Sequence, residues 1–151
     1  MIHKSRTKRS DERGSAFVEL ALFTPVLLLM MVGALDFARV YYADITLANA
    51  AEVGALYGSR SVSGSSDTAG MQTAATNDGK DLTTMTAVAT NYCSCGSTGA
   101  HQNCPATSCT GANPAHRYVK VQTTYTFNTL FPIPGIPATV PITRTAVIRV
   151  Q

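Results

Sequence analysis

Gly14, Ser15 and Glu19 are the residues whose types and spacing point most clearly to chemistry. They stand at the start of an apolar stretch, Ala16 to Leu35, whose 20 residues include Glu19 as the only ionisable side chain. A helix of that length rises about 30 Å, enough to cross the hydrocarbon layer of a bilayer. A carboxylate inside lipid is costly unless it is paired, so Glu19 marks a functional position.

The spacing of these residues predicts proteolytic processing. A cut between Gly14 and Ser15 would make Glu19 the fifth residue of the new chain, and a helix places its first and fifth residues one above the other. A free α-amine, on the same chain or on a packed neighbour, could then pair with the carboxylate. Glycine before the cut leaves the backbone open to an enzyme. The alternative is an uncleaved anchor in which Glu19 reaches towards the membrane interface.

The sequence RGSAFVE, followed by LAL, resembles the prepilin processing site, which is cleaved after glycine and has glutamate at mature position five. The longer stretch from Arg13 to Tyr57 resembles the TadE-like family, the minor pilins or pseudopilins of the Tad/Flp tight-adherence pilus. This resemblance covers about a third of the chain and depends on glycine, glutamate and proline at set spacing. It implies cleavage by a prepilin peptidase, although some members of the family are plain membrane anchors.

The same resemblance implies the partners of the chain. They are a prepilin peptidase, the Tad inner-membrane assembly platform with its cytoplasmic ATPase, the major pilin and other minor pilins. Membrane lipid is the partner expected of the apolar helix itself.

The net charge of +3 lies entirely in a basic leader, residues 1–14, while the chain from Ser15 onward has seven basic and seven acidic residues. The balance therefore does not indicate a nucleic-acid partner. Basic residues ahead of a first apolar helix favour keeping that end in the cytoplasm. We expect a single-pass protein of the inner (cytoplasmic) membrane with its body on the exported side, and a later extracellular place in a pilus.

Residues 15–58 are expected to form one transmembrane and assembly helix. Pro25 lacks an N–H and clashes with the preceding turn, which predicts a kink in the helix. Beyond the membrane the helix should pack through one stripe, either on the protein's own body, which is the simpler assumption, or on another subunit. The residues of this stripe are Phe37, Tyr41, Ile45, Ala48, Ala51 and Ala55.

Residues 59–151 are expected to form a small exported α+β body. The sequence predicts a polar loop at 59–66 and a weak helix over 67–91, capped by Ser66 or Asp67. From Arg117 the hydrophobic period changes to two, which predicts strands at 117–128 and 139–150 that pair antiparallel and pack on the long helix. The fold class is therefore α+β and pilin-like, with a C-terminal hairpin or small sheet. The residues expected on the inner face are Val119, Val121, Tyr125, Phe127, Val140, Ile142, Ala146, Ile148 and Val150.

All four cysteines fall in one loop, predicted for residues 92–116: Cys93, Cys95, Cys104 and Cys109. An even number of cysteines in an exported body favours two disulfides. Their spacing is a poor match to the paired C-x₂₋₄-C pattern of a zinc site. Three pairings are open, and we favour the nested one, Cys93–Cys109 with Cys95–Cys104, because it closes the loop as a short ladder.

The sequence contains no catalytic motif such as G-x-S-x-G or H-E-x-x-H, so neither an enzyme nor a cofactor is expected. The leading hypothesis is a structural subunit, a minor pilin or pseudopilin used in assembly of a Tad-type pilus for adhesion or surface attachment. One alternative is an uncleaved membrane-anchored envelope module that binds a surface or envelope partner. A less favoured alternative is the main filament subunit, since major Flp pilins are by resemblance shorter and almost entirely helical.

Overall fold

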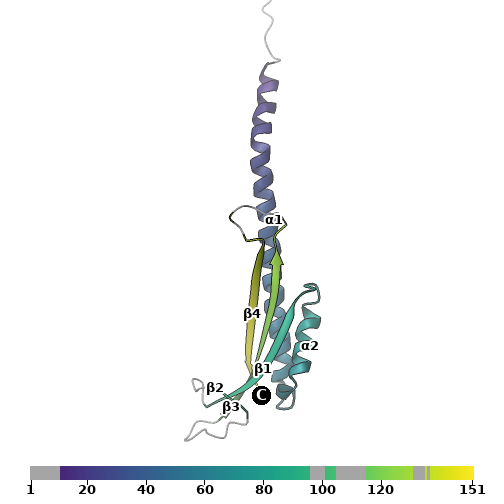
Figure 1. Cartoon of the computed structure of the whole chain (residues 1–151), viewed down its shortest axis with the longest axis vertical. Coiled ribbons are helices and arrows are strands. Elements are labelled where there is room, and N and C mark those ends of the chain that lie inside the picture. Colours follow the sequence, from purple (N-terminus) through teal and green to yellow (C-terminus); the bar gives the residue numbers. More distant parts are fainter. Residues whose placement is uncertain (1–10, 96–100, 105–114, 131–134, 136) are drawn as a thin grey trace, which may run out of the picture. The chain divides into compact units, whose positions relative to one another are not determined.

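A computed structural model of the chain describes residues 11–95, 101–104, 115–130, 135 and 137–151. The chain divides into two compact units, residues 1–38 and 39–151, which are described separately here. Most of the predicted leader, residues 1–10, lies outside the described residues. The helices and strands, in chain order (Figure 1), are α1 (Asp11–Ser59), a 3₁₀ turn (Gly64–Ser66), α2 (Thr68–Asp78), β1 (Thr86–Cys95), β2 (His101–Gln102), β3 (Ala115–Asn128) and β4 (Thr139–Arg149).

The described part of the first unit is the first part of α1. Its large apolar side chains from Phe17 to Leu35 are exposed, apart from the partly buried Val32. By length and composition the helix can cross a membrane, because the mean hydropathy of an 18-residue window reaches 2.2. α1 continues through Pro25, and the neighbouring Thr24 hydroxyl donates to the Leu20 carbonyl oxygen at 2.6 Å. The kink at Pro25 stays a prediction.

The second unit is built on an antiparallel sheet with the strand order β2-β1-β3-β4. The central strand β3 pairs along its length with β1 on one side and with β4 on the other, so that Val121 lies opposite both Ala89 and Ala146. α2 packs on β1 (Figure 1). The fold is therefore α+β and pilin-like, as the sequence predicted, with a long N-terminal helix, a short second helix and a four-stranded sheet.

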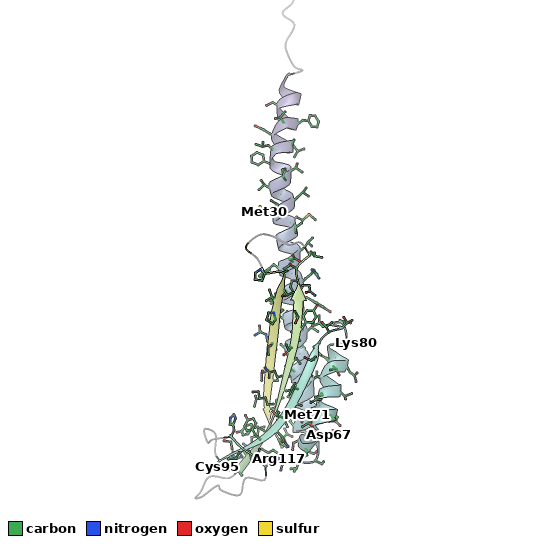
Figure 2. The ribbon with its side chains drawn as sticks, viewed as in Figure 1. Met30, Asp67, Met71, Lys80, Cys95 and Arg117 are labelled. Atoms are coloured by element: carbon green, nitrogen blue, oxygen red, sulfur yellow. A yellow bond between two sulfur atoms is a disulfide. The ribbon has the colours of Figure 1, made fainter. Side chains whose placement is uncertain are left out.

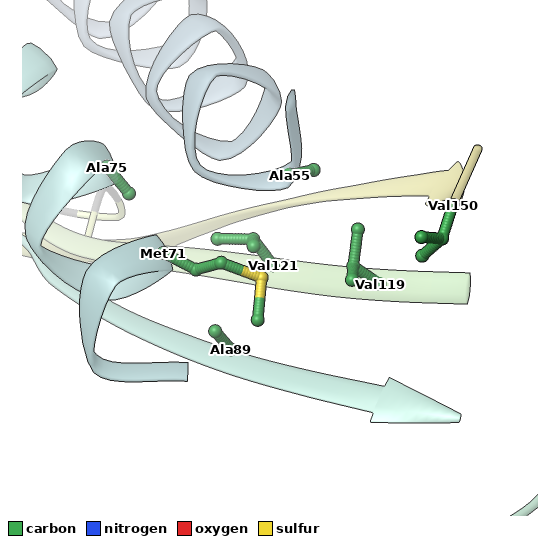
Figure 3. Close-up of a cluster of buried hydrophobic side chains, with 7 residues drawn as sticks. All are labelled: Ala55, Met71, Ala75, Ala89, Val119, Val121 and Val150. Carbon is green, nitrogen blue, oxygen red and sulfur yellow. The ribbon is translucent and has the colours of Figure 1, made fainter. Parts of the chain in front are cut away.

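The core of this unit lies between the inner face of the sheet and the two helices. Figure 3 shows its larger cluster, in which Met71 of α2 reaches the valines of β3. The members of this cluster are Ala55, Met71, Ala75, Ala89, Val119, Val121 and Val150. A second cluster joins Ala43 and Leu47 of α1 to Leu82, with Tyr125 and Ile142 packed against it. Both strand faces predicted to be apolar thus supply core residues.

The face of α1 that packs on the body differs from the predicted stripe. Of the predicted residues only Ala51 and Ala55 are buried, whereas Tyr41 and Ile45 are exposed. The helix carries apolar residues on more than one face, and its smallest residues allow the closest approach of other backbones. The buried residues of this face are Ala43, Leu47, Ala50, Ala51, Gly54, Ala55, Gly58 and Ser59.

The predicted helix over 67–91 is wrong in its second half. α2 begins after Asp67, whose side chain accepts from the Gly70 N–H at 2.8 Å and so caps the helix as predicted, but the helix ends at Asp78. Gly79 follows, and residues from Thr86 onward form β1 instead. From Thr86 to Thr90, exposed side chains alternate with the partly buried Ala87 and the buried Ala89. Pairing with β3 satisfies the backbone, so tertiary context overrides the weak helical pattern.

The predicted loop over 92–116 is also partly wrong. Its first residues, Tyr92 to Cys95, complete β1, and His101 and Gln102 form β2. Its last residues, Ala115 and His116, begin β3. Cysteine, serine and asparagine favour loops locally, but here the ladder with β3 extends the hydrogen bonding of the sheet as far as Cys95.

Candidate functional site

The three residues predicted to mark processing, Gly14, Ser15 and Glu19, lie on the exposed surface of α1 in the first unit. Ser15 and Glu19 are four residues apart on this helix and therefore share a face. Apart from the adjacent residues and the backbone of its own helical turns, no described atom lies within 4 Å of the position that a Cβ atom on Gly14 would occupy. The backbone at the predicted cut is thus uncovered by other parts of the described chain. Cleavage itself stays a prediction.

The helix after Glu19 offers an apolar surface. Within the described first unit, the side chains of Phe17, Leu20 and Phe23 are all more than half exposed. Such a surface is unsuited to water, but it is what a bilayer or a bundle of similar helices would cover.

The cysteines form disulfides, as the sequence predicted, but the nested pairing is wrong. Cys93 is bonded to Cys104, with a Cα–Cα distance of 5.3 Å. Cys95 is also disulfide-bonded, and Cys109 lies outside the described residues.

The register of the β1–β2 hairpin explains the correction. It pairs Cys93 with Gln102 and Ser94 with His101. Cys95 therefore lies beyond one end of this two-pair ladder and Cys104 beyond the other, which places Cys104 near Cys93 and away from Cys95. A hairpin inside the predicted loop could not be anticipated from cysteine spacing alone. Across the described ranges, no group of three or more His, Cys, Asp or Glu side chains could hold a metal ion.

An ion pair between α1 and β4 was not predicted from the sequence. Arg144 Nε donates to Asp44 Oδ1 at 2.7 Å and Arg144 Nη2 donates to Asp44 Oδ2 at 2.6 Å, a two-point contact. These hydrogen bonds to the carboxylate, together with its charge, raise the pKa of Arg144 above its ordinary value. The two residues are 100 positions apart in the sequence, so only the tertiary fold reveals the pair.

Two further polar contacts join the helices to each other and to the following loop. The Tyr57 hydroxyl of α1 donates to Asp67 at the start of α2, at 3.0 Å. The Tyr42 hydroxyl donates to Asp81 after α2, at 3.2 Å. Asp67 and Asp81 therefore have a structural role, because they link α2 and the residues after it to α1.

Comparison with known proteins gives one family. The family model described as "TadE-like protein" matches residues 14–56, which is the part of the chain that contains Gly14, Glu19 and Pro25. No curated protein and no solved structure matches the chain. Residues 14–56, which begin at the glycine of the predicted cut and run along α1, are thus confirmed as a TadE-like segment.

Proposed function

We propose that the chain is a structural pilin-like subunit, a minor pilin or pseudopilin, that takes part in assembly of a Tad-type pilus. A prepilin peptidase cleaves it between Gly14 and Ser15. The processed subunit waits in the inner membrane with residues 39–151 on the exported side. The assembly platform then transfers it from the lipid into contact with the major pilin and other minor pilins.

The observation that carries this proposal is the position of the family match on the structure. The match begins at Gly14, and the segment from that residue forms a helix of membrane-spanning length with an exposed carboxylate at Glu19. The TadE-like segment indicates a Tad-pilus-associated protein of a structural kind. An ordinary anchor needs no carboxylate this close to the start of its apolar run, whereas a processed subunit uses it to hold an α-amine.

Gly14 also fits the demands of cleavage. It lies inside the first turns of α1, and a peptidase must draw the backbone out of the helix to reach the bond. Glycine weakens a helix by about 1 kcal/mol relative to alanine, which makes this opening easier. The free space around its Cα leaves room for the enzyme.

Membrane storage and assembly then use the same surface. In lipid the apolar side chains of the helix are already satisfied, so helix association must come from packing and polar pairing, with extraction driven by the assembly platform. Glu19 supplies the polar pairing, either with the α-amine of Ser15 on its own chain or with that of a neighbouring subunit.

The decisive experiment is to determine the intact mass and N-terminal sequence of the native protein, from membranes and from sheared surface filaments. A chain that begins at Ser15 and is found in filaments is the expected result. Gly14→Ala, which adds one methyl group, should accumulate as the unprocessed chain, and Gly33→Ala in the same helix serves as the matched control. A native chain that still begins at Met1 and stays in membranes would overturn the proposal in favour of an uncleaved membrane-anchored envelope module.

A further inference from the structure

The hairpin of β3 and β4 turns at the end of the body where α1 enters it. Midway along β3, the Thr123 hydroxyl donates to the Leu47 carbonyl oxygen of α1 at 2.9 Å. Four residues later, the Phe127 ring lies under the guanidinium group of Arg39, which is 5.1 Å from the ring centre. β3 therefore runs towards the first residues of this unit as it approaches the turn. We use the term hairpin end for the described residues beside the turn, 127–130 and 137–140.

The hairpin end is exposed and apolar. The Thr129 N–H donates to the Ala138 carbonyl oxygen at 3.0 Å and closes the base of the turn. Leu130 follows this bond, and half of its side chain is exposed. Among residues 129–138 only Thr129 has a polar side chain, and no charged residue occurs between Lys120 and Arg144. Turns in water are ordinarily built from Asn, Asp, Ser and Gly, so this composition indicates a less polar neighbour.

The adjoining part of α1 carries residues that suit a membrane interface. Tyr41 and Tyr42 follow Arg39, and their side chains are 60% and 56% exposed. Tyrosine is enriched where a bilayer meets water, because its ring is apolar and its hydroxyl reaches the polar layer. One turn further on, Asp44 pairs with Arg144 of β4, so these two charges neutralise each other.

The continuity of α1 brings a bilayer close to the hairpin end. The apolar run ends at Leu35, four residues before Arg39, which is about 6 Å along the helix. Leu130 comes three residues after Phe127, which allows a reach of about 10 Å beyond the Phe127–Arg39 contact. With the apolar run in a membrane, the headgroup layer is therefore within reach of Leu130.

We propose that the hairpin end docks on the surface of the bilayer that α1 crosses. Leu130 enters the upper part of the acyl layer, while Arg39, lying over the Phe127 ring, stands at the level of the lipid phosphates. The stored subunit thereby has a second attachment to the membrane, which is lost when the subunit moves into a pilus. This inference rests on the proposed function for the placement of α1 in lipid.

A lipid surface fits the hairpin end better than a second copy of the chain does. A stable contact between proteins buries about 800 Å² on each partner, and the end of a two-stranded hairpin is too narrow to supply that area. The turn also has no charge with which to select a protein partner. A bilayer requires only that apolar side chains leave water, and it is joined to this end of the body by α1 itself.

The test places a single fluorescent residue in the full chain, which contains no tryptophan. Leu130→Trp is reconstituted in vesicles of phosphatidylethanolamine and phosphatidylglycerol, with and without lipids brominated near the top of their acyl chains. We expect emission that is shifted to the blue and quenched by the brominated lipids to an extent comparable with Phe17→Trp, which reports on the apolar run. Thermal unfolding checks that each variant keeps the midpoint of the native body.

Val62→Trp is the matched control, because it adds the same indole ring at another exposed apolar position. The Val62 carbonyl oxygen accepts a hydrogen bond at 3.3 Å from Arg117, which lies with Cys95 at the opposite end of the sheet (Figure 2). Its emission should resemble that of tryptophan in water and should be unaffected by brominated lipids.

Three results would overturn the docking of the hairpin end. The first is quenching of Leu130→Trp as weak as that of Val62→Trp while Phe17→Trp is quenched, which would leave the proposed function intact. The second is blue-shifted but unquenched emission that varies with the ratio of protein to lipid, which would assign the hairpin end to a second copy. The third is a lack of quenching in Phe17→Trp as well, which would refute the membrane placement of α1 and the proposed function with it.

Discussion

Gly54 and Gly58 determine how closely α2 and β3 can approach α1. A Cβ atom on Gly54 would lie 2.8 Å from the Met71 backbone oxygen and 3.1 Å from a methyl carbon of Val121. A Cβ atom on Gly58 would instead meet the Met71 sulfur. The absence of a side chain at these two positions is therefore a requirement of packing.

We predict that Gly54→Ala destabilises the body by about 1–3 kcal/mol, the usual cost of overpacking a core. Gly58→Ala should cost less, because a methionine side chain can move more easily than the backbone of α2. The measurement is the free energy of unfolding of residues 39–151 within the full chain in micelles. Gly33→Ala is the control, because the added carbon would meet no described atom within 4 Å beyond the adjacent residues and its own helical turns. If all three variants were equally stable, close packing at Gly54 would be refuted.

The Asp44–Arg144 ion pair also stabilises the body through individual residues, but by charge instead of close packing. Half of the Arg144 side chain is exposed, so salt should screen the interaction. Arg144 has a raised pKa, and a basic group of this kind contributes its stabilisation below its unfolded pKa and loses it only as pH rises through the folded value. The arginine side of the pair therefore persists through neutral and mildly alkaline pH.

We accordingly predict that Asp44→Asn lowers the thermal midpoint of the body at low salt and that high salt narrows the difference from the native protein. Asp78→Asn removes the same charge at an exposed position near the end of α2 and should change the midpoint little. An effect of Asp44→Asn that was independent of salt would contradict an electrostatic origin.

At the scale of elements, β4 is a long edge strand that needs protection from pairing with other chains. Its inner face carries Arg144 opposite Thr123, and this inward charge is satisfied only when Asp44 of α1 is in place. Inward charges are one of the devices by which edge strands avoid aggregation. The other edge strand, β2, is only two residues long and is joined to β1 through the Cys93–Cys104 disulfide.

Removing this disulfide should destabilise the hairpin end of the sheet. The bond closes a segment with a sequence separation of 11, for which the loop-entropy estimate is about 2–3 kcal/mol. Cys93→Ser, Cys104→Ser and the double variant should lose similar stability in denaturant unfolding, since each lacks the same bond. A double variant as stable as the native protein would show that the strands alone hold this end together.

The elements differ in how far the sequence predicted them. α1, β3 and β4 carry long periodic patterns, and the buried side chains of Val119, Val121 and Phe127 confirm the predicted inner face. β1 was missed because its alanines and threonines give a weak local signal, and its pairing with β3 decides its conformation. The disulfide pairing followed from β1 and β2, so that error has the same origin.

The functional residues likewise divide into those that the sequence predicted and those that only the fold brings together. Gly14, Ser15 and Glu19 could be found because they are adjacent in sequence and their spacing has a helical meaning. Asp44 and Arg144 lie 100 positions apart in the sequence, and only the tertiary fold brings them into contact. A site that depends on non-local pairing gives no pattern along a single chain.

At the scale of the whole molecule, the two units differ in where they place their apolar side chains. The first exposes a nearly uninterrupted apolar helix surface, and the second buries its apolar residues between the helices and the sheet. Under the proposed function, this division lets the N-terminal unit serve membrane storage and assembly while the body remains folded in water. Glu19 is the only ionisable residue between Ala16 and Leu35, so its removal tests the proposed assembly role without touching the body.

Glu19→Gln keeps the shape of the side chain and removes its charge. We predict that it leaves membrane insertion and cleavage intact but reduces incorporation into filaments. Insertion into the membrane should be equal or better, because a neutral side chain costs less in lipid. Cleavage after Gly14 should persist, whereas the amount of protein in sheared filaments should fall by about tenfold, the effect of losing roughly 1.4 kcal/mol of pairing with an α-amine. Quantitative mass spectrometry of membranes and filaments measures all three quantities. Unchanged filament levels would mean that the apolar surface alone directs assembly and that Glu19 has no part in it.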